Sequence, residues 1–181
     1  MNKIRKNNYV TLLILTLIFV FPGAAAYLFY THPHWLQGQS INKGELLNPP
    51  ELLENIHEQP KWRLVLWIPH DCKKNCLTQI DKLARIRLAL GRRLLNVDEL
   101  IIMNDQNQFP YSLNDRLHEQ DIHLLLISKA QQDRQKKLDN HMRIFIANPN
   151  NYLVLAYKPA TSPEDIFHDL QKLLHANEKG N

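Results

Sequence analysis

Residues 62–77 read WRLVLWIPHDCKKNCL and include both cysteines of the chain, Cys72 and Cys76. Residues 63–68 form a short, nearly continuous apolar run, which is typical of a strand buried on both faces of a sheet. A Pro-His-Asp sequence ends this run. From Leu77 onward, apolar residues recur at helical spacing along one face. The stretch therefore predicts a buried strand and an amphipathic helix, with the two cysteines in the connection between them.

The rest of the sequence predicts further strands and helices in alternation. Strands are expected at residues 97–103, 122–127, 143–147 and 152–157, and helices from Leu77, at residues 112–119 and from Ser162. Residues 128–140 are polar and predict a loop or an exposed helical turn, and an Asn-Pro-Asn-Asn turn separates the last two strands. The order strand, helix, strand, helix, strand, hairpin, helix predicts an α/β sheet with parallel crossovers and an antiparallel pair at its end. A thioredoxin-like sheet with flanking helices has this order.

The N-terminus predicts a membrane anchor. Residues 10–30 contain no charged side chain and would span ~30 Å as a helix, about one hydrocarbon core. Lys3, Arg5 and Lys6 precede this segment, so the positive-inside rule predicts a single-pass helix in the inner (cytoplasmic) membrane with the rest of the chain in the periplasm. A signal peptide cleaved after the three alanines at residues 24–26 is the alternative. Under either prediction, the domain is exported across the membrane.

The chain divides into three parts on composition. Residues 1–30 are the basic tip and anchor, residues 31–60 are a linker containing proline and glycine, and residues 61–181 are the folded domain. Within the linker, residues 51–57 are compatible with one or two helical turns. Of the 22 basic residues, three precede the apolar segment, which leaves 19 against 18 acidic residues. This balance argues against a nucleic-acid partner.

The position of the cysteines favours a reactive or metal-binding site. Loops at the carboxyl edge of a parallel sheet are where α/β folds place their sites. The start of a helix favours thiolate over thiol, and Lys73 and Lys74 act in the same direction. A spacing of four places both sulfurs on one helical face, where they can bind a common atom. Two thiolates suit Cu(I), whereas a closed zinc site needs four ligands. A further ligand would come from histidine or carboxylate, and His70 and His141 are the candidates.

Other uses of the pair stay open on this pattern. A structural disulfide is one, although so short a loop contributes only about 2 kcal/mol in the chain-entropy model. A thiol–disulfide oxidoreductase, with Cys72 as nucleophile and Cys76 as resolving thiol, is another. Thioredoxin-type enzymes use C-x2-C and a cis-proline before the facing strand, whereas residues 139–142 contain no proline. The third is a non-catalytic tethered interaction module with its cysteines locked in a disulfide.

Several segments together carry a family resemblance. They are the N-terminal anchor, NKGELLNPP at residues 42–50, residues 62–68, the cysteine pair, RLALG at residues 87–91, and IFIANP at residues 144–149 with Tyr152. With these segments the chain resembles the Sco/SenC family of membrane-anchored, thioredoxin-like copper proteins, which assist assembly of the copper site in cytochrome c oxidase. It looks closest to a short branch of that family, and the resemblance covers most of residues 42–175.

The resemblance implies a ligand set and a function. In that family two cysteines and one later histidine bind copper, which implies Cys72, Cys76 and His141 as ligands of Cu(I) or Cu(II). His70 is the alternative third ligand, and Leu77 stands where the family usually has proline. The implied protein is a metallochaperone rather than an enzyme. It would deliver copper to a terminal oxidase subunit, or to another periplasmic copper or thiol protein, or keep that partner's cysteines reduced.

Overall fold

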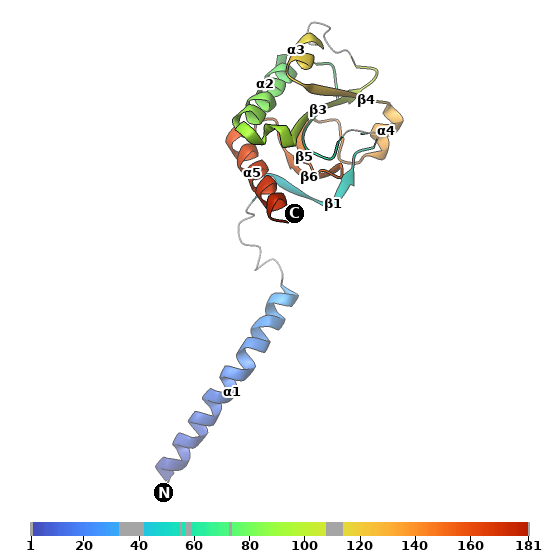
Figure 1. Cartoon of the computed structure of the whole chain (residues 1–181). Coiled ribbons are helices and arrows are strands. Elements are labelled where there is room, and N and C mark those ends of the chain that lie inside the picture. The colour runs from blue at the N-terminus through green and yellow to red at the C-terminus, as the bar shows by residue number, and fades with distance from the viewer. Residues whose placement is uncertain are drawn as a thin grey trace. The chain divides into compact units, whose positions relative to one another are not determined.

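The computed structural model describes residues 2–32, 42–54, 56, 59–72, 74–107 and 114–180, and it divides into two compact units. The first unit, Met1–Ile41, contains helix α1 (Asn2–Thr31) (Figure 1). Within α1, Leu12–Thr31 has a mean hydropathy of 2.3 and is long and apolar enough to cross a membrane. A signal sequence would meet the same criterion. The helix is therefore a candidate membrane anchor.

The second unit, Asn42–Asn181, is built on a six-stranded sheet with the strand order β1-β6-β5-β2-β3-β4. The strands are β1 (Glu45–Leu52), β2 (Trp62–Ile68), β3 (Val97–Asn104), β4 (Ile122–Ile127), β5 (Arg143–Ala147) and β6 (Tyr152–Tyr157). Strands β2, β3 and β4 run parallel, whereas β5, β6 and β1 extend the other side of the sheet in antiparallel pairs. All of β2 is buried, as the sequence predicts for a strand covered on both faces.

Helices and loops cover the two faces of this sheet. The helices are α2 (Lys74–Ala89), the 3-10 helix η2 (Gly91–Asn96), α3 (Asn114–Glu119), α4 (Lys129–Arg134) and α5 (Pro163–Gly180). Leu83 of α2 and Leu170 of α5 belong to the same core cluster as Leu66 of β2. The neighbouring residue Trp67 points to the other face and packs in a second cluster with Leu138. Helices α2 and α5 thus cover one face, and each face has its own core.

Strand β1 is the main difference from the sequence prediction. It lies inside residues 31–60, which were expected to be linker, and the compact unit begins at Asn42 rather than near Lys61. The register of β1 on β6 shifts between Leu46 and Glu51, which leaves its two prolines out of the regular ladder. Because β1 is an edge strand, a missing N–H is tolerated there. The sequence allowed one or two helical turns at residues 51–57. Residues 51–52 belong to strand β1 instead, and residues 55 and 57 lie outside the described residues.

A buried carboxylate anchors the chain just before β1. Asp169 of α5 is 1% exposed, and its Oδ2 accepts hydrogen bonds from the backbone N–H groups of Lys43 (2.7 Å) and Gly44 (2.9 Å). The Tyr157 hydroxyl donates to the same oxygen at 2.9 Å. Burial first, and then the Asp169 charge, raises the pKa of Tyr157, which keeps this hydroxyl a donor. These bonds attach the NKGELLNPP segment to the domain.

One helix, α2, differs from its predicted start, and two other helical predictions are confirmed. Helix α2 begins at Lys74 rather than Leu77 and ends at Ala89, where Gly91 with φ of +59° starts the 3-10 helix. The polar stretch expected as a loop or an exposed helical turn contains the short helix α4, whose N-terminus has a capping box between Ser128 and Gln131. The predicted cap of the last helix is confirmed, since the Asp165 N–H donates to the Ser162 hydroxyl at 3.1 Å. Residue 112 lies outside the described residues.

Candidate dithiol site

The cysteines lie between the end of β2 and the start of α2, at the carboxyl edge of the parallel strands. The carbonyl of Pro69 accepts a hydrogen bond from the Asn107 side-chain amide at 2.9 Å, which ties this connection to the loop after β3. Cys72 precedes the first helical residue by two positions, and Cys76 lies in the first turn of α2. The predicted position between strand and helix is therefore what the structure has.

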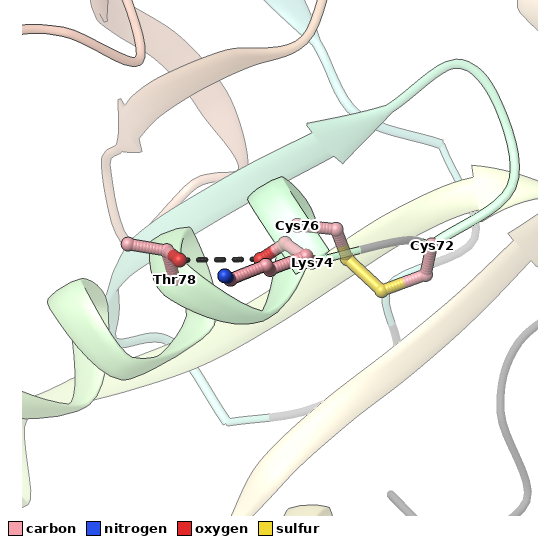
Figure 2. Close-up of a disulfide and its surroundings, with 4 residues drawn as sticks. All are labelled: Cys72, Lys74, Cys76 and Thr78. Carbon is pink, nitrogen blue, oxygen red and sulfur yellow. Dashed lines mark hydrogen bonds between the residues drawn. A yellow bond between two sulfur atoms is a disulfide. The ribbon is translucent and has the colours of Figure 1, made fainter.

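Cys72 and Cys76 are joined in a disulfide, with their Cα atoms 5.3 Å apart (Figure 2). Both side chains are buried, with exposed fractions of 6% and 1%, and both belong to the core cluster that α2 shares with the sheet. Because Cys72 lies outside the helix, the sulfurs meet through the turn that leads into α2, not because both lie on one helical face. Of the predicted site residues, the structure brings these two together.

In the disulfide state neither sulfur is a thiolate, so neither can act as a nucleophile or a strong metal ligand. A two-electron reduction would give two thiols at the start of a 16-residue helix. The partial positive charge of a helix N-terminus favours their ionised forms. The reduced pair would then offer two adjacent soft donors on a rigid core element. The arrangement can support disulfide exchange, and binding of a soft metal ion.

The two candidate histidines are not gathered around the sulfurs. His141 precedes β5, and because Arg143 of β5 pairs with Trp67 of β2, it lies toward the same sheet edge as the cysteines. Its side chain is 82% exposed, with Nδ1 3.6 Å from an Asp139 carboxylate oxygen. His70 is also exposed. Among the described residues, no three His, Cys, Asp or Glu side chains are arranged to hold a metal ion together. The third ligand stays a prediction.

A tryptophan fixes the loop that carries His141, which the sequence did not reveal. The Trp67 indole N–H donates to the Asp139 carbonyl at 2.6 Å, from a side chain that is fully buried. The Arg143 guanidinium lies 3.4 Å from the Asp139 carboxylate and holds the same loop from the start of β5. The only sign of this contact in the sequence is a tryptophan within a buried strand. Because core packing explains a tryptophan there equally well, the sequence could not predict the hydrogen bond.

A closed cysteine pair at the junction of the first parallel strand and its helix, on this sheet, defines a thioredoxin-like protein with a redox-capable site. The chain belongs to the family described as transmembrane-like, thioredoxin-like, C-terminal domain, whose model matches residues 62–177. No curated protein sequence matches the chain.

Solved structures that are similar to this chain include copper proteins and a thiol-disulfide oxidoreductase. Copper-bound ScoI from Arabidopsis thaliana superposes with a TM-score of 0.52 and 13% identity, covering 65% of this chain and 86% of that one. Copper-bound ScoI from Bradyrhizobium japonicum has a TM-score of 0.46 and 18% identity, covering 63% and 85%. The thioredoxin domain of a Bacteroides vulgatus thiol-disulfide oxidoreductase has a TM-score of 0.45 and 13% identity, covering 64% and 80%. The Arabidopsis likeness establishes the thioredoxin-like fold, not an activity.

Proposed function

We propose that this protein is a membrane-tethered, Sco-like factor whose reduced Cys72/Cys76 pair binds copper and helps to assemble the copper site of a cytochrome c oxidase subunit. The observation that carries the proposal is the placement of both sulfurs within bonding distance at the start of α2. Helix α1 is the tether. The domain lies in the periplasm and the anchor in the inner membrane, because basic residues precede the apolar segment.

The donor set suits copper as cargo. Two thiolates match the preference of Cu(I) for soft ligands, and binding would release the two thiol protons to water. His141, or His70 in its place, would add an imidazole that lets the site also hold Cu(II). Both rings are exposed rather than packed in the core, so neither is committed to a structural role by burial. The low exposure of the cysteines favours a small ion over a large partner as the species that reaches both sulfurs.

Thiol–disulfide exchange is the second candidate, and the closed disulfide is the observation that favours it. A thiolate of a partner dithiol would attack the Cys72 sulfur, which is the more exposed of the two, and Cys76 would leave as a thiolate. The partner's second thiolate would then displace Cys72 and close the partner's own disulfide. Two electrons pass from the partner to this protein, or in the reverse direction from this protein to an oxidised oxidase subunit.

Copper stoichiometry on the full chain in detergent tests the first candidate. The protein would be reduced, loaded with Cu(I), desalted and analysed for metal per chain. We expect one copper for the wild type and none for Cys76→Ser. His141→Ala and His70→Ala identify the third ligand, since only loss of the ligand should weaken retention, and His118→Ala is the matched control at an exposed position on α3.

The outcomes separate the two candidates. A reduced wild type that retains no copper refutes the copper proposal. In that case a reduction potential near that of a dithiol partner, measured without metal, would support exchange. Cysteines that stay oxidised in the presence of excess dithiol would contradict both candidates and favour the non-catalytic module.

A further inference from the structure

A second candidate site lies at the other end of α2 from the cysteines. A pocket of about 350 Å³ is enclosed by the C-terminal part of α2, the 3-10 helix η2, the start of β3 and the end of α3. The cysteines lie at the carboxyl edge of the parallel strands, whereas Glu99 of this pocket is the third residue of β3. The pocket is therefore separate from the dithiol site.

The interior of this pocket contains an unsatisfied acceptor beside a buried carboxylate. The side-chain oxygen of Gln120 is buried and has no hydrogen-bond partner in the described part of the chain. Glu99, in the same lining, is 2% exposed, and none of the described hydrogen bonds or ion pairs reaches its carboxylate. A buried acceptor that lacks a donor is destabilising. Because the two groups line one cavity, a single ligand could donate hydrogen bonds to both.

Arg87 lines the same pocket, and three of its five N–H groups donate to other acceptors. Its Nε donates to the Val97 carbonyl (2.8 Å), Nη1 to the Gln120 carbonyl (3.1 Å) and Nη2 to the Asp121 carboxylate (3.1 Å). With Glu99 and Asp121, Glu119 also lines the pocket, so the lining contains three carboxyl groups and one guanidinium. Fully ionised, the lining has a net negative charge, which attracts a cation.

The rim of the same pocket is apolar. Leu88 and Leu95 are 70% and 71% exposed, and Leu94 packs against the core beside them. Leu88 belongs to the RLALG segment, which the dithiol site does not use. Single exposed leucines are ordinary, but here they surround a polar interior. The combination fits a ligand with an aliphatic body and a compact cationic end.

We infer that this pocket binds a lysine side chain presented by an apolar segment of a partner protein. The ammonium would donate to the Glu99 carboxylate and the Gln120 side-chain oxygen. The four-carbon stem and flanking apolar residues would cover Leu88 and Leu95. The inference is independent of copper or thiol chemistry, since it assigns a docking surface that leaves the cysteine edge of the sheet uncovered.

The test uses the full chain in lipid nanodiscs and two probe peptides, acetyl-Leu-Lys-Leu-amide and its norleucine analogue. Binding is followed through the backbone amide signals of η2 and β3 at pH 8. We expect the lysine peptide to bind at least about tenfold more tightly, as a charge-assisted hydrogen bond provides. Glu99→Gln should abolish this preference. Leu95→Ser should weaken both peptides without disturbing the core, since Leu95 is exposed.

Glu164→Gln, at an exposed acid in the first turn of α5, is the matched control and should bind as the wild type does. Equal affinity for the two peptides overturns the inference, as does a lysine preference that survives Glu99→Gln or the absence of any shift in η2 and β3. Free hexylamine is the last probe. If it binds as tightly as the peptide, the pocket is a small-amine site and the partner segment is ruled out.

Discussion

Replacing Glu99 with glutamine should stabilise the protein, by an amount that grows as pH rises from about 4.5 to 7 and is constant at higher pH. Burial raises the pKa of Glu99 from 4.5 to about 7, with the Arg87 charge opposing the shift and the Asp121 charge adding to it. Between these two values the folded state binds a proton that the unfolded state has lost. The free energy of unfolding therefore falls as pH rises from about 4.5 through 7. Besides Arg87 and Asp121, the charged groups near this carboxyl include Glu119 in the pocket lining and His123, whose Nε2 lies 3.9 Å from Asp121.

The difference between the two pKa values sets the size of the effect. At about 1.4 kcal/mol for each pH unit, ionised Glu99 lowers the free energy of unfolding by roughly 3 kcal/mol once the pH exceeds 7. Glutamine has nearly the same shape and no charge to bury. Glu99→Gln should thus raise the free energy of unfolding by ~2–3 kcal/mol at pH 8.5 and leave it almost unchanged at pH 4.5.

Denaturant unfolding of the full chain in detergent, followed by tryptophan fluorescence from pH 4.5 to 8.5, measures this difference. The fluorescence reports the domain, because Trp67 is fully buried and Trp62 nearly so. Glu164→Gln is the control for removing a carboxylate that is exposed. A Glu99→Gln protein that is less stable than wild type at pH 8.5, or equally shifted at both pH values, would refute the reasoning.

Three further predictions concern the anchor of β1 and the disulfide. Asp169→Asn removes the negative charge from the group whose oxygen accepts three hydrogen bonds, so we expect the free energy of unfolding to fall by ~2–3 kcal/mol. Limited proteolysis should also cut the chain before β1 sooner than in the wild type. An unchanged cleavage pattern would contradict the anchoring role. Gly44→Ala would place its Cβ 2.5 Å from the Tyr157 ring, and denaturant unfolding should show a loss of ~1–3 kcal/mol, whereas wild-type stability would mean that the ring moves freely. Reduction of the Cys72–Cys76 bond should lower the free energy of unfolding by about 2 kcal/mol in paired titrations, and a much larger loss would assign the bond a mainly structural role.

The strands that the sequence predicts are those with a continuous apolar pattern. Residues 63–68 and 97–103 match β2 and β3 to within a residue, because both strands are buried along their whole length. Strand β1 escaped prediction because its sequence contains two prolines and little alternation. What holds it is Asp169, a carboxylate 125 positions away from Gly44 in the chain. No local sequence pattern can predict a contact between residues so far apart in the chain.

The two candidate sites also differ in how far the sequence predicts them. The cysteines are unique in composition and lie in one short connection, so their position and proximity can be predicted from the sequence. The pocket at the end of α2 draws its lining from four elements, and Glu99 looks in the sequence like any polar residue at the start of a strand. Its significance depends on its burial in the pocket lining, which only the folded arrangement reveals.

Helix α2 connects the two sites, and its attachments suggest that they work independently. Cys76 lies in its first turn, and Arg87 anchors its last turn to the Val97 carbonyl. Between them, the Lys82 ammonium donates to the carbonyls of Pro159 (2.6 Å) and Thr161 (2.8 Å), which ties the middle of the helix to the turn before α5. Since the C-terminal half of α2 is held by hydrogen bonds that do not involve sulfur, opening the disulfide should leave the pocket in place. Chemistry at the cysteines and docking at the pocket can then occur on one molecule at the same time, as a tethered assembly factor that holds its partner while it acts would require.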